Sequence, residues 1–315
     1  MKLPLIYLVS PCYNEEDALP ITSKAFADKI NSLINSKKIA AESKILFVDD
    51  GSSDDTWNII KNLNCKNPKT FEGVKLSKNR GHQNALLAGL MAAKEKCDAV
   101  ISLDADLQDD INAIDEMIEK FKNGAQIVYG VRSDRQNDTI FKKSTALIFY
   151  KFLESLGVES VRNHADFRLT SRSVLNDLEN FNEVNLYMRA IFPQIGYKQE
   201  IVYYSRQLRD AGESKYPFNK MLGLAIDGVT SFSVKPLRVI TTLGLAIIVA
   251  SIVVTLYLLY VKLSGGTPQG LSFIAISIWL LGGVQMCSIG IVGEYIGKIY
   301  METKARPRYI IEETV

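Results

Sequence analysis

Apolar and polar positions alternate in blocks along residues 1–130 of the chain. Short apolar runs that end in polar turns have the length of strands, and the segments between them show helical patterns. This alternation favours an α/β domain with a mostly parallel sheet, in which ligands bind beyond the carboxyl ends of the strands. The predicted strands are Leu5–Ser10, Lys44–Asp49, Gly73–Ser77, Ala99–Leu103 and Ile127–Val131, and the predicted helices are Glu15–Asn35, Asp55–Leu63, Gln83–Lys96 and Asn112–Asn123.

A different pattern begins at residue 239. The segments Val239–Val261 and Leu271–Val292 contain no charged residue, and each is longer than the roughly 20 residues that cross about 30 Å of hydrocarbon. A turn-rich connection, residues 263–270, joins them. We therefore predict a transmembrane hairpin within residues 237–297. The alternative is a pair of buried core helices, but two such charge-free runs in tandem rarely occur in a soluble fold.

Basic residues gather at the outer ends of this predicted hairpin. Only Lys262 lies beside the connecting loop, whereas the ends carry Lys235, Arg238, Lys298, Lys304, Arg306 and Arg308. By the positive-inside rule, both ends face the cytoplasm. The apolar run Leu5–Val9 is too short for the core of a signal peptide. The sequence therefore predicts a multi-pass protein of the cytoplasmic membrane, with a cytoplasmic domain over residues 1–216 and a cytoplasmic tail over residues 298–315.

Two further segments flank the predicted spans. The apolar residues within 217–236 suit an amphipathic helix that lies on the bilayer surface. In the tail, Arg306–Glu312 alternates weakly between polar and apolar residues, which predicts a strand.

Composition excludes several classes of protein. The 37 Lys and Arg residues against 35 Asp and Glu residues give a net charge of +2, which is too balanced for a general nucleic-acid binder. A hydrophobic fraction of 47% excludes a mainly disordered chain. The 4 cysteines are scattered and there are only 2 histidines, which argues against a zinc cluster, a disulfide framework or a histidine-based metal site. No G-x-G-x-x-G follows the first two predicted strands, so a dinucleotide-binding enzyme is disfavoured.

The strongest local signal for chemistry is Ser102–Asp110, at the end of an apolar strand. Asp104 and Asp106 lie two residues apart there, so their side chains can point to one side of the sheet edge. Carboxylates this close repel each other unless a cation lies between them. Mg²⁺ takes oxygen ligands and commonly joins one or two carboxylates to substrate phosphates. The segment therefore predicts a divalent-metal site; the alternative is a solvated acidic loop.

Two basic clusters complement this acidic segment. Cations of this kind suit an enzyme that brings two phosphate-bearing reactants together, because like charges a few Å apart oppose approach. The alternative is a solvated basic face near anionic lipids. The first cluster is Arg132, Arg135, Lys142 and Lys143, and the second is Arg206, Arg209, Lys215 and Lys220.

Six motifs together resemble a known family. With the hairpin added, they resemble the family 2 glycosyltransferases of the polyisoprenyl-phosphate type, namely the bactoprenol glucosyltransferases and, more distantly, dolichol-phosphate mannose synthase. The resemblance covers nearly the whole chain and implies a GT-A-type nucleotide-sugar-binding domain. Taken alone, the first two motifs are also explained by helix capping and turn formation. The motifs are Ser10–Glu16, Val48–Thr56, Lys78–Ala85, Ser102–Asp110, Ala165–Leu169 and Arg206–Tyr216.

The resemblance implies a role for each matching position. The expected catalytic residues are Asp106 and Asp166, of which Asp166 matches an acid proposed in relatives to orient or deprotonate the acceptor. The expected ligands of a Mg²⁺ or Mn²⁺ ion are Asp104, Asp106 and Gln108. The expected contacts of the lipid phosphate are Arg132, Lys143 and Ser144. The expected contacts of the nucleotide sugar are Pro11, Tyr13, Glu15, Asp50, Asp104, Ala105, Arg209 and Lys215.

The role of Asp166 has an alternative. An acceptor phosphate is largely ionised at neutral pH, because the second pKa of a phosphate monoester is about 6. Such a nucleophile needs positioning more than it needs a strong base. The sequence therefore supports Asp166 as a general base less strongly than it supports Asp104 and Asp106 as metal ligands, and the alternative is a structural acid paired with Arg168 or Arg162. His82 and His164 are predicted to form hydrogen bonds rather than to bind metal.

The predicted reaction is the inverting transfer of a hexose, glucose from UDP-glucose, to undecaprenyl phosphate, which serves modification of cell-surface glycans such as lipopolysaccharide O-antigen. The alternatives are the same chemistry with GDP-mannose or with a UDP-linked 4-amino-4-deoxyarabinose donor. A non-enzymatic membrane protein is disfavoured because the motif residues are all present. A processive synthase is disfavoured because Arg206–Arg209 is not a Q-x-x-R-W motif. Relatives associate through the tail, so a homo-oligomer such as a tetramer is expected, and nucleic acid is not an expected partner.

Overall fold

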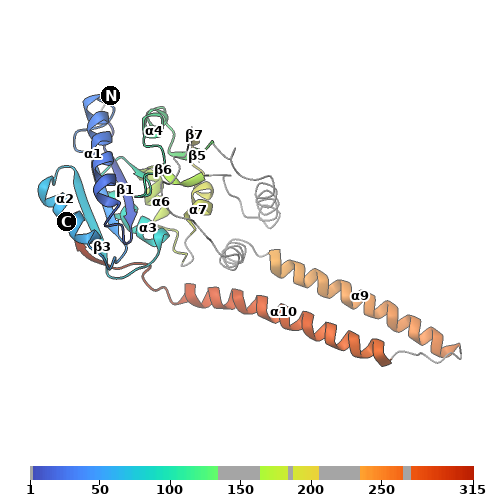
Figure 1. Cartoon of the computed structure of the whole chain (residues 1–315). Coiled ribbons are helices and arrows are strands. Elements are labelled where there is room, and N and C mark those ends of the chain that lie inside the picture. Colours follow the sequence, from blue (N-terminus) through green and yellow to red (C-terminus); the bar gives the residue numbers. More distant parts are fainter. Residues whose placement is uncertain (1–2, 134–163, 184–186, 206–234, 265–270) are drawn as a thin grey trace. The chain divides into compact units, whose positions relative to one another are not determined.

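Figure 1 shows the computed structural model, which describes residues 3–133, 164–183, 187–205, 235–264 and 271–315. The N-terminal part is built on an eight-stranded sheet with the strand order β7-β5-β6-β4-β1-β2-β3-β8. Its strands are β1 (Ile6–Cys12), β2 (Lys44–Asp49), β3 (Phe71–Leu76), β4 (Ala99–Ser102), β5 (Ile127–Arg132), β6 (His164–Ser171), β7 (Gln199–Tyr204) and β8 (Ile311–Thr314). The helices beside it are α1 (Leu19–Asn35), α2 (Thr56–Lys66), α3 (His82–Ala93), α4 (Ala113–Lys122), α6 (Arg172–Leu178) and α7 (Met188–Ile195).

The strands and helices predicted within residues 1–130 are all present, with their ends shifted by a few residues. The largest shift is at α1, which begins at Leu19 rather than at Glu15. Pro20 lies in the first turn of α1, where a residue without an N–H is well tolerated. Glu15 therefore belongs to the loop that follows β1, at the carboxyl end of that strand.

The sequence pattern does not predict β6 and β7. β6 is antiparallel to both of its neighbours, β4 and β5, so the sheet is mostly but not wholly parallel. Its residues alternate between polar and apolar up to Thr170, and the polar ones that the structure describes are buried too, with Arg168 only 1% exposed. The guanidinium carbon of Arg168 lies 3.9 Å from the centre of the Phe192 ring. The described polar side chains of β6 are therefore buried along with its apolar ones.

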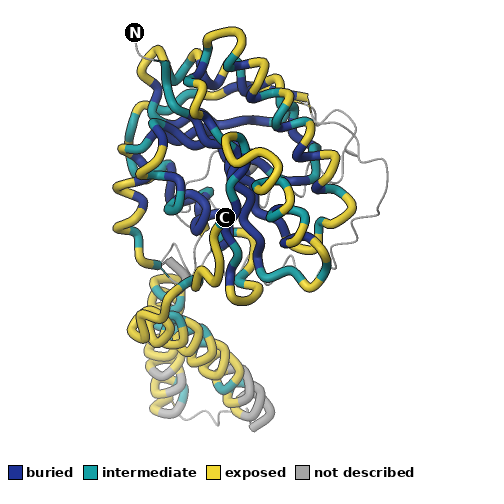
Figure 2. Tube along the Cα trace, turned by 90° about the vertical axis from the view of Figure 1, so that its left-hand side faces the viewer, coloured by how far each residue is buried: buried dark blue, intermediate teal, exposed yellow. Residues whose placement is uncertain are grey.

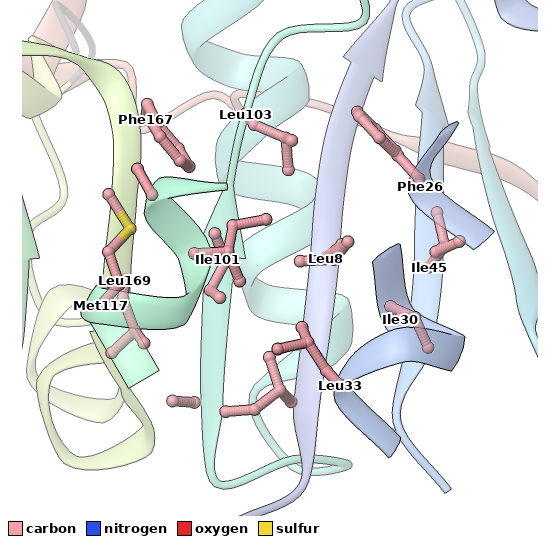
Figure 3. Packing of buried hydrophobic residues seen from close by; sticks show 14 of the residues in the cluster. Leu8, Phe26, Ile30, Leu33, Ile45, Ile101, Leu103, Met117, Phe167 and Leu169 are labelled. Atoms are coloured by element: carbon pink, nitrogen blue, oxygen red, sulfur yellow. The ribbon is translucent and has the colours of Figure 1, made fainter. Parts of the chain in front are cut away.

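Helices cover both faces of the sheet. Leu8 and Val9 are neighbours in β1, so their side chains point to opposite faces. Leu8 belongs to a core that includes Phe26 of α1 and Met117 of α4 (Figure 3). Against Val9 lies α3, where a Cβ added to Gly89 would stand only 2.5 Å from Val9 Cγ1. The close packing on both faces fixes the strand ends and the loops that leave them.

The C-terminal part contains two long helices, α9 (Lys235–Leu263) and α10 (Leu271–Thr303). Unlike the central strands of the sheet, which are buried, the described residues of these helices are mostly exposed (Figure 2); Leu256 is 60% exposed and Ile289 is 65% exposed. Apolar helices in this state need lipid or another chain to cover them. Within the residues that the structure describes, Leu237–Val261 is one helix with the length and mean hydropathy, 2.6, of a membrane span. The second predicted span lies in α10, whose first side chains are outside the described set.

After α10 the chain adds strand β8 to the edge of the sheet. β8 pairs antiparallel with β3, and the indole N–H of Trp57 donates a hydrogen bond to Glu313 Oε2 at 2.8 Å. The strand predicted in the tail is therefore present, but it covers Ile311–Thr314 and begins later than expected. The predicted amphipathic helix lies, up to residue 234, outside the described residues. The homo-oligomer stays a prediction.

Candidate active site

The sheet brings the predicted site residues to one edge. Strands β1, β2, β3, β4, β5 and β7 run in the same direction, so their carboxyl ends meet there, and the antiparallel β6 begins there. Asp50 follows β2, Asp104 follows β4, Arg132 ends β5, and Asp166 lies near the start of β6. Residues that are far apart in the sequence thereby share the edge at which α/β proteins bind ligands.

Strand pairing sets Asp104 beside Asp166. Ser102 of β4 pairs with Arg168 of β6, and two residues further along this register Asp104 is level with Asp166. The hydroxyl of Ser102 donates a hydrogen bond to the carbonyl oxygen of Asp166 at 2.5 Å, which holds the two strands together here. His82 contacts both carboxylates, because its Nε2 lies 3.6 Å from Asp104 Oδ1 and 3.3 Å from Asp166 Oδ2. His82 thus has the hydrogen-bonding role predicted for it.

The loop after β4 presents the two aspartates of the predicted metal site. Its backbone turns at Leu107, which has a left-handed φ of 53°. Asp106 Oδ1 accepts a hydrogen bond from the backbone N–H of Gln108 at 3.1 Å. Ala105 is buried, whereas Asp104 and Asp106 on either side of it are partly exposed. The loop therefore directs both carboxylates away from the core.

Asp104 lies among like charges. Burial, assisted by the negative charges of Asp109, Asp166 and Asp106, raises the pKa of Asp104 to about 6, and the neighbouring His82 opposes this rise only in part. A raised carboxyl pKa means that the charged form is destabilised where it stands. A cation placed beside Asp104 would remove this penalty.

A divalent cation fits this loop. Asp104 and Asp106 offer carboxylate oxygens, and the buried side chain of Gln108 beside them has an amide oxygen that could serve as a further ligand. No set of three or more His, Cys, Asp or Glu side chains among the described residues is arranged to hold a metal ion. The described residues would therefore supply few of the ligands. This matches Mg²⁺, which usually keeps several waters and takes one or two carboxylates together with substrate phosphates.

Asp166 is surrounded by donors. Its carboxylate accepts hydrogen bonds from Gln83 Nε2 at 3.1 Å and from Arg189 Nη2 at 3.2 Å, and Arg168 Nη2 lies 3.7 Å away. Burial alone would raise the pKa of Asp166, but the hydrogen bond from His82 and the two guanidinium charges hold this pKa well below its usual range. A carboxylate stabilised in this way is a weak base. The geometry therefore favours an orienting or structural role for Asp166 over proton abstraction.

Hydrogen bonds join the loop after β1 to the loop after β2. The backbone N–H of Asn14 donates to Ser52 Oγ at 2.9 Å, and the backbone N–H of Ser53 donates to Asn14 Oδ1 at 2.9 Å. These loops carry the predicted contacts of the nucleotide. Tyr13 is 47% exposed and is open to a ligand, whereas Pro11 is buried.

The other two predicted nucleotide contacts of these loops differ in their surroundings. Glu15 is partly exposed. Asp50 is only 3% exposed, and its two carboxylate oxygens accept the backbone N–H groups of Arg80 at 2.7 Å and of Gly81 at 2.8 Å. Asp50 therefore fixes the loop that leads into α3 and to His82. Any bond from Asp50 to a nucleotide would share a carboxylate that is already engaged.

Arg132 is the one member of the two basic clusters that the structure describes. Its side chain is 31% exposed, and its Nη2 lies 3.4 Å from Asp109 Oδ1. The other predicted phosphate contacts, Arg209, Lys215, Lys143 and Ser144, lie outside the described residues, as do Arg135, Lys142, Arg162, Arg206 and Lys220.

Three residues at this edge were not predicted to belong to the site. Arg189, in the first turn of α7, contacts Asp166. Asp109 and Tyr204 both contact Arg132. The only signal for Asp109 is its place in the acidic segment after β4, and Arg189 and Tyr204 have no sequence signal because strand and helix packing alone brings them here.

Two family descriptions match the chain. Residues 7–179 match Glycosyl transferase family 2, and residues 235–299 match the GtrB C-terminal hairpin. The uncharacterised glycosyltransferase YkoT of Bacillus subtilis is 49% identical over 98% of this chain and 91% of its own length. A prophage bactoprenol glucosyl transferase homolog of Escherichia coli and the bactoprenol glucosyl transferase of Shigella phage SfX are each 40% identical over 98% of this chain and 98% of their own.

The mostly parallel sheet, the acidic strand ends and these similarities together define a glycosyltransferase with a GT-A-like fold. The chain belongs to glycosyl transferase family 2, and it carries the C-terminal hairpin of the GtrB type. The predicted family and the predicted fold class are both confirmed.

Proposed function

We propose that this protein transfers glucose from UDP-glucose to undecaprenyl phosphate at the cytoplasmic face of the membrane, with inversion at the anomeric carbon. The names of the 40% identical relatives support a polyprenol-based acceptor and a glucosyl donor. The observation that carries the proposal is the sheet edge, where Asp104 and Asp106 suit a metal-bound diphosphate donor and Arg132 suits a phosphate acceptor. Asp109, in contact with Arg132, lies on the same loop as the two aspartates.

The donor end of the site would be built around the loop after β4. Asp104 and Asp106, with Gln108 beside them, would hold a Mg²⁺ or Mn²⁺ ion. A bound ion would neutralise negative charge on the departing nucleoside diphosphate. Tyr13 and Glu15 are partly or largely exposed and would contact the nucleotide, and Arg209 and Lys215 would close over its diphosphate.

The acceptor end of the site would be built around Arg132. Guanidinium groups bind phosphate oxygens in a two-point geometry, and Lys143 and Ser144 would add further contacts. An oxygen of the acceptor phosphate would attack the anomeric carbon as the bond from that carbon to the diphosphate breaks, which releases UDP. The nucleophile is already ionised, so the step needs alignment more than proton removal.

Asp166 would act as an orienting residue in this reaction. It binds Arg189 and Gln83 and lies 3.3 Å from His82 Nε2. Its low pKa keeps it charged, so it holds these side chains in fixed positions next to Asp104. We assign it no proton transfer.

The path of the chain supports a membrane hairpin with both ends on the side of the catalytic domain. α9 begins after the domain, and the few residues after α10 lead directly to β8, which is part of the domain's own sheet. A chain that crosses the bilayer through α9 must therefore cross it again through α10. The basic residues at both ends favour the cytoplasmic side.

The test uses the purified full-length protein in detergent or reconstituted membranes, with undecaprenyl phosphate as the acceptor. Labelled UDP-glucose, GDP-mannose and a UDP-linked 4-amino-4-deoxyarabinose are offered separately and in competition, and the glycolipid is identified by mass spectrometry. We expect glucosyl-phosphoryl-undecaprenol and UDP. A product from GDP-mannose or from the aminoarabinose donor alone would overturn the choice of donor, and no lipid product with any of them would overturn the proposed reaction.

A further inference from the structure

Arg132 is held by a tyrosine on the neighbouring strand. In the parallel pairing of β5 with β7, Arg132 lies opposite Tyr204. Its Nε donates a hydrogen bond to the hydroxyl of Tyr204 at 3.2 Å. The backbone N–H of Ser133 donates to the carbonyl oxygen of Tyr204 at 2.9 Å, which continues the pairing past the end of β5. The backbone on both sides of this contact is therefore fixed.

The same tyrosine is bonded to the loop that carries the metal-site aspartates. The hydroxyl of Tyr204 donates to Asp109 Oδ1 at 2.5 Å, and Arg132 Nη2 lies 3.4 Å from that same oxygen. Asp109 is 7% exposed, and its other oxygen, Oδ2, has no hydrogen-bond partner among the described residues. A buried carboxylate is costly unless it is paired. Asp109 therefore depends on Tyr204 and Arg132.

The ring of Tyr204 is itself fixed by packing. It is 4% exposed and meets the ring of Phe167 edge-on, with the ring centres 5.3 Å apart. A hydroxyl on a ring held this way has a definite position. Among the described residues, Arg132 uses two of its five N–H donors on Tyr204 and Asp109. Its side chain remains 31% exposed, so the guanidinium still has surface to offer to an anion.

We propose that Tyr204 and Asp109 are positioning residues for Arg132. They hold its guanidinium in position to bind the acceptor phosphate. They also connect Arg132 to the loop of Asp104 and Asp106, so that the donor end and the acceptor end of the site are structurally coupled. This inference rests on the proposed acceptor role of Arg132.

The test compares Tyr204→Phe and Asp109→Asn with Tyr203→Phe. Tyr203 is the neighbouring residue of β7 and is 68% exposed, so it is a matched control. In Tyr204→Phe the ring and its packing on Phe167 are kept and only the hydroxyl is lost. We expect the KM for undecaprenyl phosphate to rise about tenfold, which is the loss expected for one hydrogen bond to a charged group. We expect the KM for UDP-glucose to change less than twofold, and Tyr203→Phe to behave as wild type.

A double-mutant cycle separates positioning from simple structural support. Arg132→Lys keeps the charge but loses the planar group that Tyr204 orients. If Tyr204 acts through Arg132, adding Tyr204→Phe to Arg132→Lys has less than a twofold further effect on the KM for the lipid. Fully additive effects, or a Tyr204→Phe variant that matches Tyr203→Phe, would overturn the inference. Should Asp109→Asn fail to fold, Tyr204→Phe alone decides.

Failure of the proposed function is recognised separately. Equilibrium binding of undecaprenyl phosphate to the full-length variants is measured beside turnover, with undecaprenol as the uncharged reference. A wild-type protein that transfers no sugar refutes the proposed reaction. The binding measurements still test the positioning role of Tyr204. This role is supported if Tyr204→Phe weakens binding of undecaprenyl phosphate about tenfold, and it is overturned if binding is unchanged.

Discussion

Asp104 and Asp166 lie level with each other at the same sheet edge, both near His82, and yet their surroundings are opposite. Asp104 is partly exposed beside other carboxylates, and its pKa rises to about 6. Asp166 is buried among His82, Arg168 and Arg189, and its pKa falls well below the usual range. The loop after β4 thus presents a carboxylate whose charge His82 offsets only in part, while β6 presents one that has His82 and two guanidinium groups beside it.

This difference shows which carboxylate can serve a ligand. A metal ion gains most where burial and neighbouring negative charge destabilise a carboxylate, as they do at Asp104. At Asp166 the same ion would have to displace two guanidinium groups. We conclude that the carboxylates of the site have two roles. Asp104 and Asp106 are available to an incoming cation, whereas Asp166 holds the protein's own cationic side chains in place.

The largest effect is expected from removing the open carboxylates. Asp104→Asn and Asp106→Asn should each lower the rate of glucose transfer by about 10²-fold or more, because charge stabilisation of the leaving group is lost. The assay follows labelled lipid product. Asp28→Asn, an exposed aspartate of α1, is the matched control and should keep full activity. Full activity in both Asp104→Asn and Asp106→Asn would contradict the role of these carboxylates in binding a cation.

A large effect on stability is expected at the other carboxylate. Asp166→Asn leaves Arg168, which is 1% exposed, without its counter-charge. Removing one partner of a buried ion pair typically costs about 3–5 kcal/mol. Chemical denaturation of the full-length protein in detergent should show a drop of this order in the free energy of unfolding. A loss below about 1 kcal/mol, the range of exposed pairs, would mean that Asp166 is not the anchor of this cluster.

The two carboxylates should also give opposite dependences of stability on pH. The folded pKa of Asp104 is about 6, above the unfolded value of about 3.9, so the folded state binds the extra proton. Asp104 therefore makes the metal-free protein less stable as the pH rises from about 4 to about 6. Asp166, whose pKa is lowered, contributes stability at neutral pH that is lost as the pH falls below about 4.

Denaturation at several pH values, with and without Mg²⁺, measures both contributions. Asp104→Asn should remove the decline between about pH 4 and 6, and Mg²⁺ should reduce that decline in the wild type. An unchanged decline in Asp104→Asn would assign it to another group.

The smallest effect is expected from Arg189→Gln. The Arg189 side chain is 39% exposed, so solvent screens its ion pair with Asp166 and the loss should be about 1 kcal/mol or less. Arg168 and His82 remain to compensate Asp166 in this variant. The same denaturation assay checks the value. A loss equal to that of Asp166→Asn would show that Arg189 alone balances the charge.

Asp104 and Asp106 were predictable from the sequence, whereas of the cationic partners of Asp166 only Arg168 was named from it. Asp104 and Asp106 are recognisable because they follow an apolar strand two residues apart, which is a local signal. The other partners, His82 and Gln83 of α3 and Arg189 of α7, reach Asp166 through the packing of these helices, which no local pattern indicates.

In the fold, too, local patterns were predictable from the sequence and non-local pairing was not. The strands and helices of residues 1–130 have regular periodicity and were found from it. The C-terminal helices were found from their lack of charge, but that pattern gives no indication that β8 joins the edge beside β3. Local signals thus define the elements, whereas non-local pairing completes the site.

The most direct test is to titrate the purified full-length protein with Mn²⁺ in the presence of UDP and to measure the heat of binding. The wild type and Asp28→Asn should bind the ion alike, and Asp104→Asn and Asp106→Asn should bind it at least about tenfold more weakly. Equal Mn²⁺ affinity in all four proteins would show that these neighbouring carboxylates do not hold the cation.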